Sequence, residues 1–321
     1  MKFILRDKKV SFCSPYPTLA IAGGEKCKTL KNVEKVWQFL LEHQATRHDT
    51  LVCVGGGSIS DLGGFAAATY KRGMRWEVIP TTLLSMVDAS IGGKTGINFA
   101  GLKNSVGVIA KPIHRLNDSP INLSYLESLP YEQFLSGMGE VIKTCLLGTE
   151  DDFYAALRAL EDGHIDKALI LRCRTIKEDI VRRDPKEKNI RKALNLGHTI
   201  GHALEEHTTL NAQHTTLHTP LSHGRAVLYG LIAELYLSVM HAGMDREPLR
   251  ILTHLMIEHY GKLGWSCKDY DMLLQRMRED KKNLHAGEIN FTLLHAIGQP
   301  CINQVLPDAA IKEAMEYLFT V

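Results

Sequence analysis

Residues 51–73 constrain the fold more than any other segment of this chain. A short apolar run at 51–54 leads into Gly55, Gly56 and Gly57, and residues 58–71 then carry small apolar side chains at helical spacing. This order predicts a strand, a tight turn and a helix. Glycine lets a backbone approach a phosphate closely, and the first turn of a helix offers free N–H groups to it. The run is not G-x-G-x-x-G, so tight packing of strand on helix, with no ligand, is the alternative interpretation.

The rest of the chain shows two kinds of sequence pattern, one on each side of about Pro130. Residues 28–43 predict an amphipathic helix, and 76–80 and 106–110 predict further strands. Beyond about Pro130 the patterns are helical, with one late strand or hairpin edge at 289–296. The predicted helices are 131–147, 151–160, 165–183, 190–208, 224–241, 247–263 and 269–281. We therefore expect a Rossmann-like α/β domain over 1–129 and an α-helical domain over 130–321.

Composition excludes several kinds of partner. Lys and Arg total 38 against 36 Asp and Glu, a formal net charge of +2, so no overall basic field indicates nucleic acid. No apolar run is long enough to span a bilayer, and residues 1–12 do not resemble a secretory signal. The 7 cysteines are widely spaced, without a C-x-x-C pair. We expect a cytoplasmic protein with reduced thiols that binds neither nucleic acid nor membrane.

A second glycine-containing segment, residues 87–98, contains the sequence G-G-K-T at 92–95, which resembles the end of a phosphate-binding P-loop. Asp88 stands where that motif requires its first glycine, so a Walker A site is not expected. What remains is a predicted polar loop, which with the residues that follow would suit a phosphorylated, hydroxyl-rich ligand. A solvated surface loop is the alternative. The polar residues are Asp88, Lys94, Asn98, Lys103 and Asn104.

The histidines give the strongest signal for chemistry. His198 and His202 are four residues apart on a predicted helix and therefore share one face. Glu140 lies on an earlier predicted helix, and His223 comes directly before a later one. One carboxylate with imidazoles from separate helices is a plausible shell for a catalytic Zn²⁺ ion. The alternative is a structural or solvated histidine pair. His214 and His218, in a Thr-rich stretch, are predicted to be loop residues.

Taken together, these segments resemble the 3-dehydroquinate synthase family of sugar-phosphate cyclases. The blocks that carry the resemblance follow the family's order and span most of the chain. They are residues 55–73, 79–98, 101–104, 137–143 (G-M-G-E-V-I-K), 194–205 (L-N-L-G-H-T-I-G-H-A-L-E), 223–224 and 280–282. The resemblance implies a cytoplasmic enzyme of aromatic amino acid biosynthesis, acting as a homodimer. Such an enzyme converts 3-deoxy-D-arabino-heptulosonate 7-phosphate to 3-dehydroquinate and phosphate, using NAD catalytically and a divalent metal, Zn²⁺ or Co²⁺.

The resemblance also implies roles for individual residues. The implied metal ligands are Glu140, His198 and His223. The implied NAD contacts are Glu25, Lys28, Gly56, Gly57, Asp61, Thr81, Thr82 and Lys103. The implied substrate contacts are Asp88, Lys94, Asn104, Lys143, Lys177, Arg191, Asn195, His202 and one of Lys281 or Lys282, with Arg72 completing the phosphate site across a dimer interface.

The sequence departs from the family pattern at several places. Before Glu25 we expect a shortened nucleotide-binding portion, without the strand–helix–strand segment that the family has there. Arg225 follows His223-Gly224 where the family has an acidic residue, and Gln133 stands in place of Glu. Three alternatives therefore stay open: another sugar-phosphate cyclase, a catalytically degenerate paralogue, and a polyol dehydrogenase. The last is disfavoured by the cationic residues Lys94, Lys143, Lys177 and Arg191.

Overall fold

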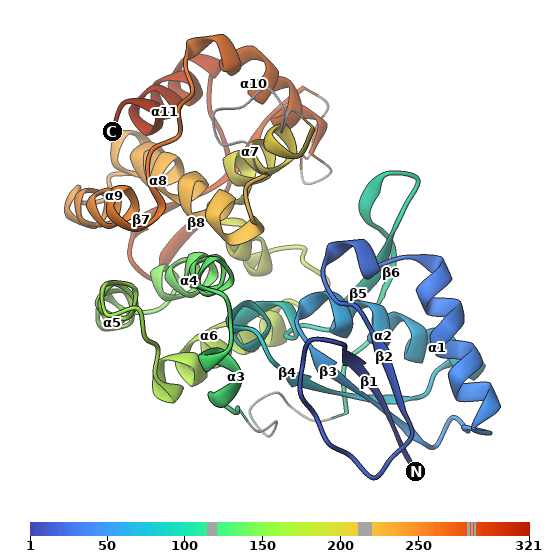
Figure 1. The fold of residues 1–321 in the computed structure, drawn as a ribbon. Helices are drawn as coiled ribbons and strands as arrows, with labels where there is room; N and C mark the ends of the chain where they lie inside the picture. Colours follow the sequence, from blue (N-terminus) through green and yellow to red (C-terminus); the bar gives the residue numbers. More distant parts are fainter. Residues whose placement is uncertain (114–120, 211–219, 281–282, 284, 286) are drawn as a thin grey trace. The chain divides into compact units, whose positions relative to one another are not determined.

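The computed structural model describes residues 1–113, 121–210, 220–280, 283, 285 and 287–321. These residues form two compact units, Met1–Gly137 and Met138–Val321 (Figure 1). The first unit combines a parallel sheet with helices, and the second is mainly helical, so the expected combination of an α/β and a helical domain is confirmed. In the described part of the chain, no helix is both long and apolar enough to cross a membrane.

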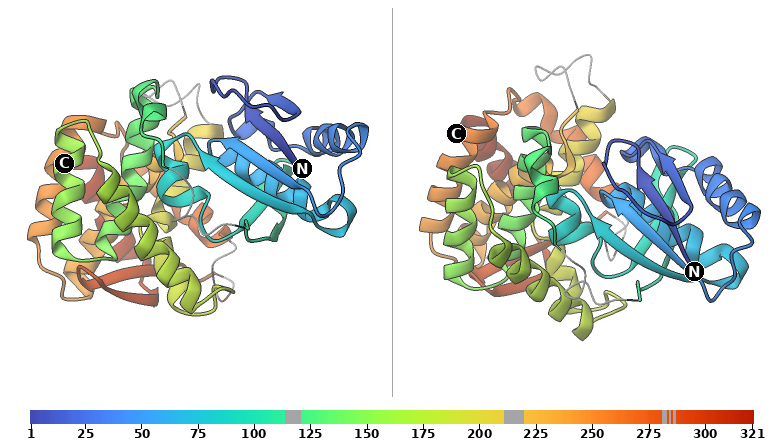
Figure 2. Two further views of the ribbon diagram at one scale, coloured as in Figure 1. Left: turned by 90° about the horizontal axis from the view of Figure 1, so that it is seen from below. Right: turned by 60° about the horizontal axis from the view of Figure 1, so that its bottom comes forward.

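The first unit is built on a four-stranded parallel sheet in the order β2-β1-β3-β4. The strands are β1 (Lys2–Asp7), β2 (Thr18–Ile21), β3 (Thr50–Gly55) and β4 (Arg75–Pro80). Every residue of β3 is buried, as its continuous apolar sequence requires of a central parallel strand. Leu51 and Cys53 share one hydrophobic core with α1 (Leu30–Glu42) and α2 (Gly57–Thr69), whereas Val52 and Val54 belong to a separate cluster with Ile4. Figure 2 shows the ribbon from two further directions.

Strands β1 and β2 were not among the predicted elements. They lie before Glu25, and the connection between them, residues 8–17, contains no helix. The sequence signal in β1 is weak because the charged residues Lys2, Arg6 and Asp7 flank three buried apolar side chains. The segment before Glu25 is therefore part of the sheet, with two strands.

The prediction of a polar loop over 87–98 is wrong in its second half. A short π-helix, Ser85–Ala89, is followed by the antiparallel hairpin of β5 (Lys94–Phe99) and β6 (Leu102–Ile109). Ile97 joins the hydrophobic core, and the hydroxyl of Thr95 donates to the carbonyl of Val108 across the hairpin (3.1 Å). The strand predicted at 106–110 is present, but it pairs with β5 and not with the parallel sheet.

The second unit contains most of the predicted helices. After the short α3 (Ser124–Glu127), α4 spans Tyr131–Leu146 and continues from the first unit into the second. The others are α5 (Glu150–Glu161), α6 (Lys167–Arg183), α7 (His198–Leu210), α8 (His223–His241), α9 (Glu247–Tyr260), α10 (Tyr270–Glu279) and α11 (Asp308–Thr320). A hairpin of β7 (Asn290–Ala296) and β8 (Gln299–Val305) precedes α11, and neither β8 nor α11 was predicted.

The helix predicted over 190–208 is interrupted. Residues Ile190–Asn195 form 3-10 turns, and α7 starts only at His198. Gly197 between them has φ of +77°, a left-handed conformation that glycine adopts without strain. A side chain there would also clash with Leu231 of α8. The break places Asn195 and His198 on different elements.

Candidate functional site

Glu140, His198 and His223 come together in the second unit, each from a different helix. Their candidate ligand atoms all lie within 4.8 Å of one another. Oε1 of Glu140 is 3.4 Å from Nε2 of His198 and 3.3 Å from Nε2 of His223. Glu140 is fully buried, and Oε1 accepts no hydrogen bond from the described residues, whereas Oε2 pairs with the ammonium of Lys143. A buried carboxylate oxygen facing two imidazole nitrogens is a donor set that suits Zn²⁺ or a similar cation.

The outer nitrogens of the two imidazoles are also held. Nδ1 of His198 lies 3.0 Å from the carbonyl oxygen of Leu196, and Nδ1 of His223 lies 3.0 Å from Oε2 of Glu205. A carbonyl or an ionised carboxylate can only accept, so Nδ1 carries the hydrogen and donates in both cases. Each ring therefore turns its Nε2 toward Glu140. This is the arrangement by which outer contacts orient histidines that bind a metal.

Charges at this site are set by burial and by the neighbours. Burial opposes ionisation of Glu140, but the charge of Lys143 and the nearby imidazole of His198 outweigh it and hold the pKa well below its usual value. Burial lowers the pKa of His198 to about 3 against the attraction of Glu140. For His223 the contacts with Glu140 and Glu205 outweigh burial and raise the pKa to about 10. The ionised carboxylate of Glu140 therefore favours a cation beside the two imidazoles.

Glu234 on α8 is a site residue that the sequence analysis missed. It is fully buried, and its carboxylate accepts the backbone N–H groups of Gly197 (2.6 Å), Thr199 (3.0 Å) and Ile200 (3.2 Å). These are orphan donors of the first turn of α7, where a negative charge also suits the helix dipole. Glu234 therefore fixes the helix start that carries His198. The sequence did contain a signal for this role: Glu234 is the one carboxylate of a largely apolar helix, and a buried carboxylate requires hydrogen-bond donors.

Small residues let α7 and α8 approach closely enough for this contact. A Cβ added to Gly230 of α8 would overlap the carbonyl oxygen of Gly197, and one added to Gly201 would lie 2.9 Å from the carbonyl oxygen of Ala226. The glycines at 197 and 201, next to the two predicted histidines, thus serve helix packing. They bring His198 and His223 to the same side of the pair.

Some of the predicted substrate residues join the metal-site histidines. The ring of His202 lies 5.2 Å from that of His198 and 5.8 Å from that of His223, and its Nδ1 is 3.5 Å from Asp280. Lys143 is buried against Glu140. Lys281 and Lys282 lie outside the described residues, as do His214 and His218.

The other substrate candidates of the second unit lie on α6 and on the turns before α7. Lys177 and Arg191 are buried, and the guanidinium of Arg191 donates to the carbonyl of Pro185 (2.9 Å). The amide of Asn195 donates to Oε1 of Glu187 (3.5 Å). Glu187, which the sequence analysis did not single out, has a left-handed backbone with φ of +57°. A carboxylate is thereby held next to Asn195.

The first unit gathers the predicted cofactor residues in two places. Lys28 is buried and donates to Asp61 (2.8 Å) and to Oδ1 of Asn104, and it also pairs with Glu25 at 3.4 Å. Asn98 ties the same group together by donating to Glu25 (2.8 Å) and accepting from the backbone N–H of Asn104 (2.8 Å). Asn104, predicted to hold substrate, thus lies with the residues predicted to hold NAD.

The second place is the start of α2. Gly56 and Gly57 lie where β3 ends, and a Cβ on Gly56 would come within 3.1 Å of Thr82. The N–H of Thr81 donates to the carbonyl of Gly55, and the N–H of Gly24 donates to the hydroxyl of Ser58, both at 3.0 Å. A helix start lined by glycine and threonine can bind a phosphate group.

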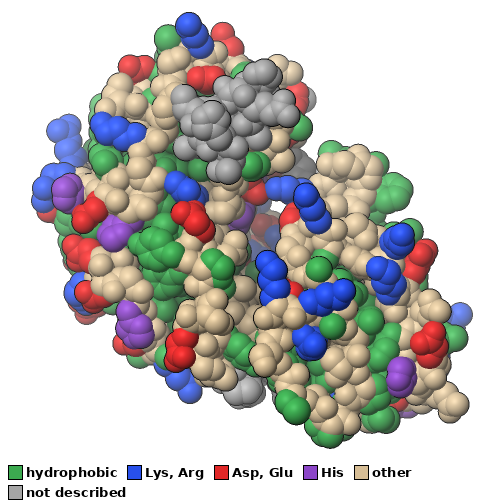
Figure 3. Space-filling view, viewed as in Figure 1, with side chains coloured by type: hydrophobic (Ala, Val, Ile, Leu, Met, Phe, Trp, Pro, Cys, Tyr) green, Lys and Arg blue, Asp and Glu red, His purple; other side chains and the backbone are tan. Residues whose placement is uncertain are grey.

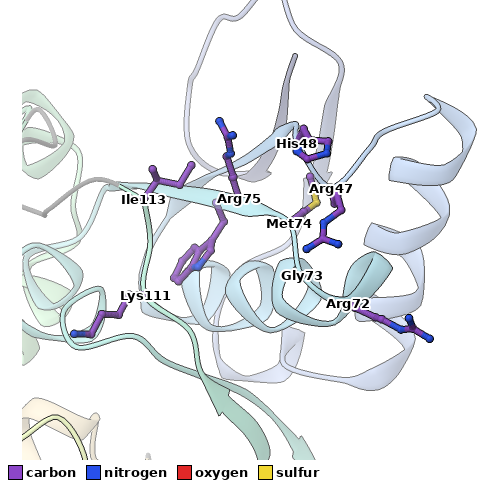
Figure 4. A pocket seen from close by; sticks show the side chains of 9 residues that line it. Arg47, His48, Arg72, Gly73, Met74, Arg75, Lys111 and Ile113 are labelled. Atoms are coloured by element: carbon purple, nitrogen blue, oxygen red, sulfur yellow. The ribbon is translucent and has the colours of Figure 1, made fainter.

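The remaining candidates of the first unit lie in three further places. Asp88 is on the turn after β4, whereas Lys94 and Lys103 are exposed on the β5–β6 hairpin. Lys and Arg side chains are frequent on the visible face of this unit (Figure 3). Arg72 is exposed and is one of the residues that line a pocket, and Figure 4 shows it pointing away from Arg47 and Arg75.

Two of the residues that depart from the family pattern, Arg225 and Gln133, lie in α8 and α4. The guanidinium of Arg225 donates to the carbonyl oxygen of Tyr260 (2.7 Å), the last residue of α9. The hydroxyl of Tyr229 reaches the same oxygen at 2.9 Å. A cation suits the C-terminal end of a helix, so Arg225 caps α9. Gln133 is exposed in the first turn of α4.

Comparison with known proteins agrees with this architecture. The family model described as 3-dehydroquinate synthase N-terminal matches residues 18–136, and 3-dehydroquinate synthase C-terminal matches residues 137–283. A relative named 3-dehydroquinate synthase from Parabacteroides distasonis is 41% identical over 305 residues, covering 94% of this chain and 83% of its own. One of the same name from Clostridium tetani is 34% identical over 303 residues, covering 92% and 76%.

Solved structures are similar over nearly the whole chain. The structure of 2-deoxy-scyllo-inosose synthase complexed with carbaglucose-6-phosphate, NAD⁺ and Co²⁺ has a TM-score of 0.80 at 25% identity and covers 98% of this chain and 90% of its own. That of 2-epi-5-epi-valiolone synthase from Streptomyces hygroscopicus, with NAD⁺ and Zn²⁺ bound, has a TM-score of 0.82 at 21% identity, with 99% and 90% covered. The second similarity concerns the fold alone.

Proposed function

The chain belongs to the 3-dehydroquinate synthase family, and we propose that it converts 3-deoxy-D-arabino-heptulosonate 7-phosphate to 3-dehydroquinate with release of phosphate. The observation that carries this proposal is the fully buried carboxylate of Glu140, which faces Nε2 of both His198 and His223 and pairs with Lys143. A core with a purely structural role would not be expected to contain these charged and polar side chains, because burying a charge without full compensation is destabilising.

Glu140, His198 and His223 would hold a divalent metal, Zn²⁺ or Co²⁺. When bound, the metal supplies Lewis-acid chemistry that makes a substrate hydroxyl more acidic. The chain's own contribution is orientation. Leu196 and Glu205 fix the two rings from outside, and Glu234 anchors the first turn of α7. Lys143 places an ammonium group beside the carboxylate, where it can donate to a substrate oxygen.

NAD would bind in the first unit. When bound, it supplies reversible acceptance of a hydride. The start of α2, with Gly56, Gly57, Thr81 and Thr82, offers N–H and hydroxyl donors to its phosphates. The group formed by Glu25, Lys28 and Asp61 offers carboxylates for ribose hydroxyls, with Lys103 exposed nearby on the hairpin. These assignments are supported by the contacts within the group.

The substrate carries a carboxylate and a phosphate, and the remaining candidates would bind them. The cations Lys143, Lys177 and Arg191 are buried, so their attraction for an anion is weakly screened. His202 and Asn195 would donate to substrate oxygens. We extend the proposal to Asp88, Lys94, Asn104 and one of Lys281 or Lys282. We also propose a homodimer in which Arg72 completes the phosphate site of the partner copy. Cytoplasmic location stays a prediction.

A different sugar phosphate is the second candidate substrate. The similarity to 2-deoxy-scyllo-inosose synthase, whose structure holds carbaglucose-6-phosphate, supports it. Such ligands lack the carboxylate, so they would make one charged contact fewer with the buried cations Lys143, Lys177 and Arg191 than the sugar acid does. We therefore favour the sugar-acid substrate.

The proposal is tested by measuring phosphate release from the purified protein. The chelated protein is given 3-deoxy-D-arabino-heptulosonate 7-phosphate, with and without NAD⁺ and with and without added Zn²⁺. We expect release only with both, together with formation of 3-dehydroquinate. Sedoheptulose 7-phosphate and glucose 6-phosphate serve as substrates without the carboxylate. Turnover of one of these in place of the sugar acid would support another cyclase, and no release from a metal-loaded protein would support the degenerate paralogue.

A further inference from the structure

His223 lies between two groups of ligating side chains. The inner group is Glu140, His198 and His223, and the outer group is His202, Glu205 and His223. In each group the candidate ligand atoms lie within 4.8 Å of one another. Nε2 of His223 faces the inner group and Nδ1 faces the outer one. A neutral imidazole binds a metal through one nitrogen only, so a single cation occupies one of the two positions.

Burial decides between the two positions. Glu140 is 0% exposed, and its Oε1 accepts no hydrogen bond within the described part of the chain. In the outer group, the side chain of His202 is 38% exposed. A buried carboxylate oxygen without a donor is destabilising, whereas partly exposed side chains are solvated by water. A cation at the inner position relieves that cost, and one at the outer position does not.

With the metal at the inner position, Glu205 is left as the outer partner of His223. The two histidine ligands then differ in how they are held. His198 donates from Nδ1 to a backbone carbonyl, that of Leu196, which the turn before α7 fixes. His223 is the first residue of α8, its side chain is 34% exposed, and its Nδ1 lies 3.0 Å from Oε2 of Glu205. Its ring orientation therefore depends on one carboxylate from α7.

We propose that Glu205 is a positioning residue that fixes the ring of His223 and directs its Nε2 to the metal. The inference rests on the metal site of the proposed function and adds a residue to which neither the motifs nor the metal-ligand set gave a role. Loss of such an outer carboxylate typically weakens metal affinity by about 10- to 100-fold, because the ligand loses its orientation and part of its basicity.

The full chain offers a matched set of variants. Glu205→Ala removes the contact, and Glu205→Gln keeps an acceptor but loses the charge. Glu206→Gln is the control, because Glu206 is the next residue on α7 and pairs with Arg276 at 3.0 Å with 57% of its side chain exposed. His202→Gln separates the two metal positions, since His202 belongs to the outer group alone. Circular dichroism and the unfolding midpoint of each metal-free variant show whether it is folded.

The readouts are the dissociation constant of Co²⁺, by competition with a chelator, and the visible spectrum of the bound ion. We expect Glu205→Ala to raise the constant by about 10- to 100-fold and to change the spectrum, with Glu205→Gln between it and the unsubstituted chain. In Glu206→Gln and His202→Gln the dissociation constant should stay within about threefold of its value in the unsubstituted chain.

Unchanged Co²⁺ affinity in a folded Glu205→Ala variant would overturn the inference. So would a loss in His202→Gln as large as that in Glu205→Ala, since it would place the metal in the outer group. If the unsubstituted chain binds no Co²⁺, the proposed metal site is wrong, and Glu205 then has no metal ligand to position.

Discussion

Gly139 of α4 lies directly against the backbone of Gly224 of α8, so close that a Cβ on Gly139 would overlap the carbonyl oxygen of Gly224. Each glycine is the neighbour of a candidate metal ligand, Glu140 or His223. The two ligands can approach because neither helix has a side chain at the crossing. The pair G-E on one helix and H-G on the other is therefore one structural feature.

Gly139→Ala should separate the helices and weaken the metal site. Overpacking of this kind costs about 1–3 kcal/mol of unfolding free energy, and we expect the dissociation constant of Co²⁺ to rise by roughly tenfold or more. Gly163→Ala is the control, because Gly163 has φ of +61° and open space around its Cβ position. It should destabilise by about 1 kcal/mol through backbone strain alone and leave metal affinity unchanged. Equal metal affinity in both variants would contradict the role of the crossing.

Glu234→Ala should be strongly destabilising. It would leave the N–H groups of Gly197, Thr199 and Ile200 without their buried acceptor. Each such loss costs about 1–3 kcal/mol, so we expect a decrease of about 3 kcal/mol or more in the unfolding free energy measured in urea. Glu258→Gln, at an exposed position of α9, should stay within about 0.5 kcal/mol. A small effect of Glu234→Ala would mean that water replaces the carboxylate.

Arg225 should matter for α9 and not for the metal. Arg225→Ala removes the contact with the carbonyl of Tyr260 and should cost about 1 kcal/mol of unfolding free energy. Arg225→Glu restores the acidic residue of the family pattern but places a negative charge near the C-terminal end of α9, so it should cost more than Arg225→Ala. Co²⁺ affinity should change by less than about twofold in both variants. A gain in affinity with Arg225→Glu would instead tie this position to the metal site.

Lys28→Met should weaken NAD binding by roughly tenfold or more, because Asp61 and Glu25 lose the cation that holds them. Lys31→Met, at an exposed position of α1, removes the same charge outside the group and should bind NAD as the unsubstituted chain does. Titration of NAD⁺ by calorimetry or fluorescence measures both. Identical affinities would place the nucleotide elsewhere in the first unit.

Asp152 gives a pH dependence of stability. It caps α5 through Thr149 and pairs with Arg172 at 2.7 Å. Burial raises its pKa, but the contacts with Thr149 and Arg172 outweigh burial and leave the folded-state pKa below the ordinary value of 3.8. Its contribution is therefore fully present above pH 4 and is lost as the pH falls through the lower folded-state pKa.

Asp152→Asn should consequently reduce the unfolding free energy by about 1–2 kcal/mol at pH 7. The difference in unfolding free energy between the variant and the unsubstituted chain should become smaller as the pH falls below about 4. Denaturant unfolding at a series of pH values measures it. A difference that does not vary with pH would show that the cap acts without its charge.

The sequence was most informative where one local pattern determines one element. The apolar run and glycines at 51–57 were sufficient for β3 and the start of α2, because a buried strand and a tight turn each leave a short, strong signal. The first strand of the hairpin from Lys94 was not predicted, because Lys94, Gly96 and Asn98 interrupt its apolar residues. Strand β1 was not predicted, because its stability comes from pairing with the distant strand β3. The break at Gly197 was missed for a related reason: helical periodicity continues through it, and only the packing of α8 shows that α7 must start later.

By itself, the sequence determined the family, the order of the motifs and the identity of the candidate ligands, since these depend on residue types at short spacing. The tertiary structure decided which groups meet. It placed Asn104 with Lys28, set Glu234 beneath the start of α7, and put Glu205 behind His223. It also decided which imidazole nitrogen faces Glu140. Most of these choices depend on contacts between residues far apart in the sequence, such as Lys28 with Asn104 and Glu234 with Thr199. The role of a carboxylate can be assigned only when the donors around it are known.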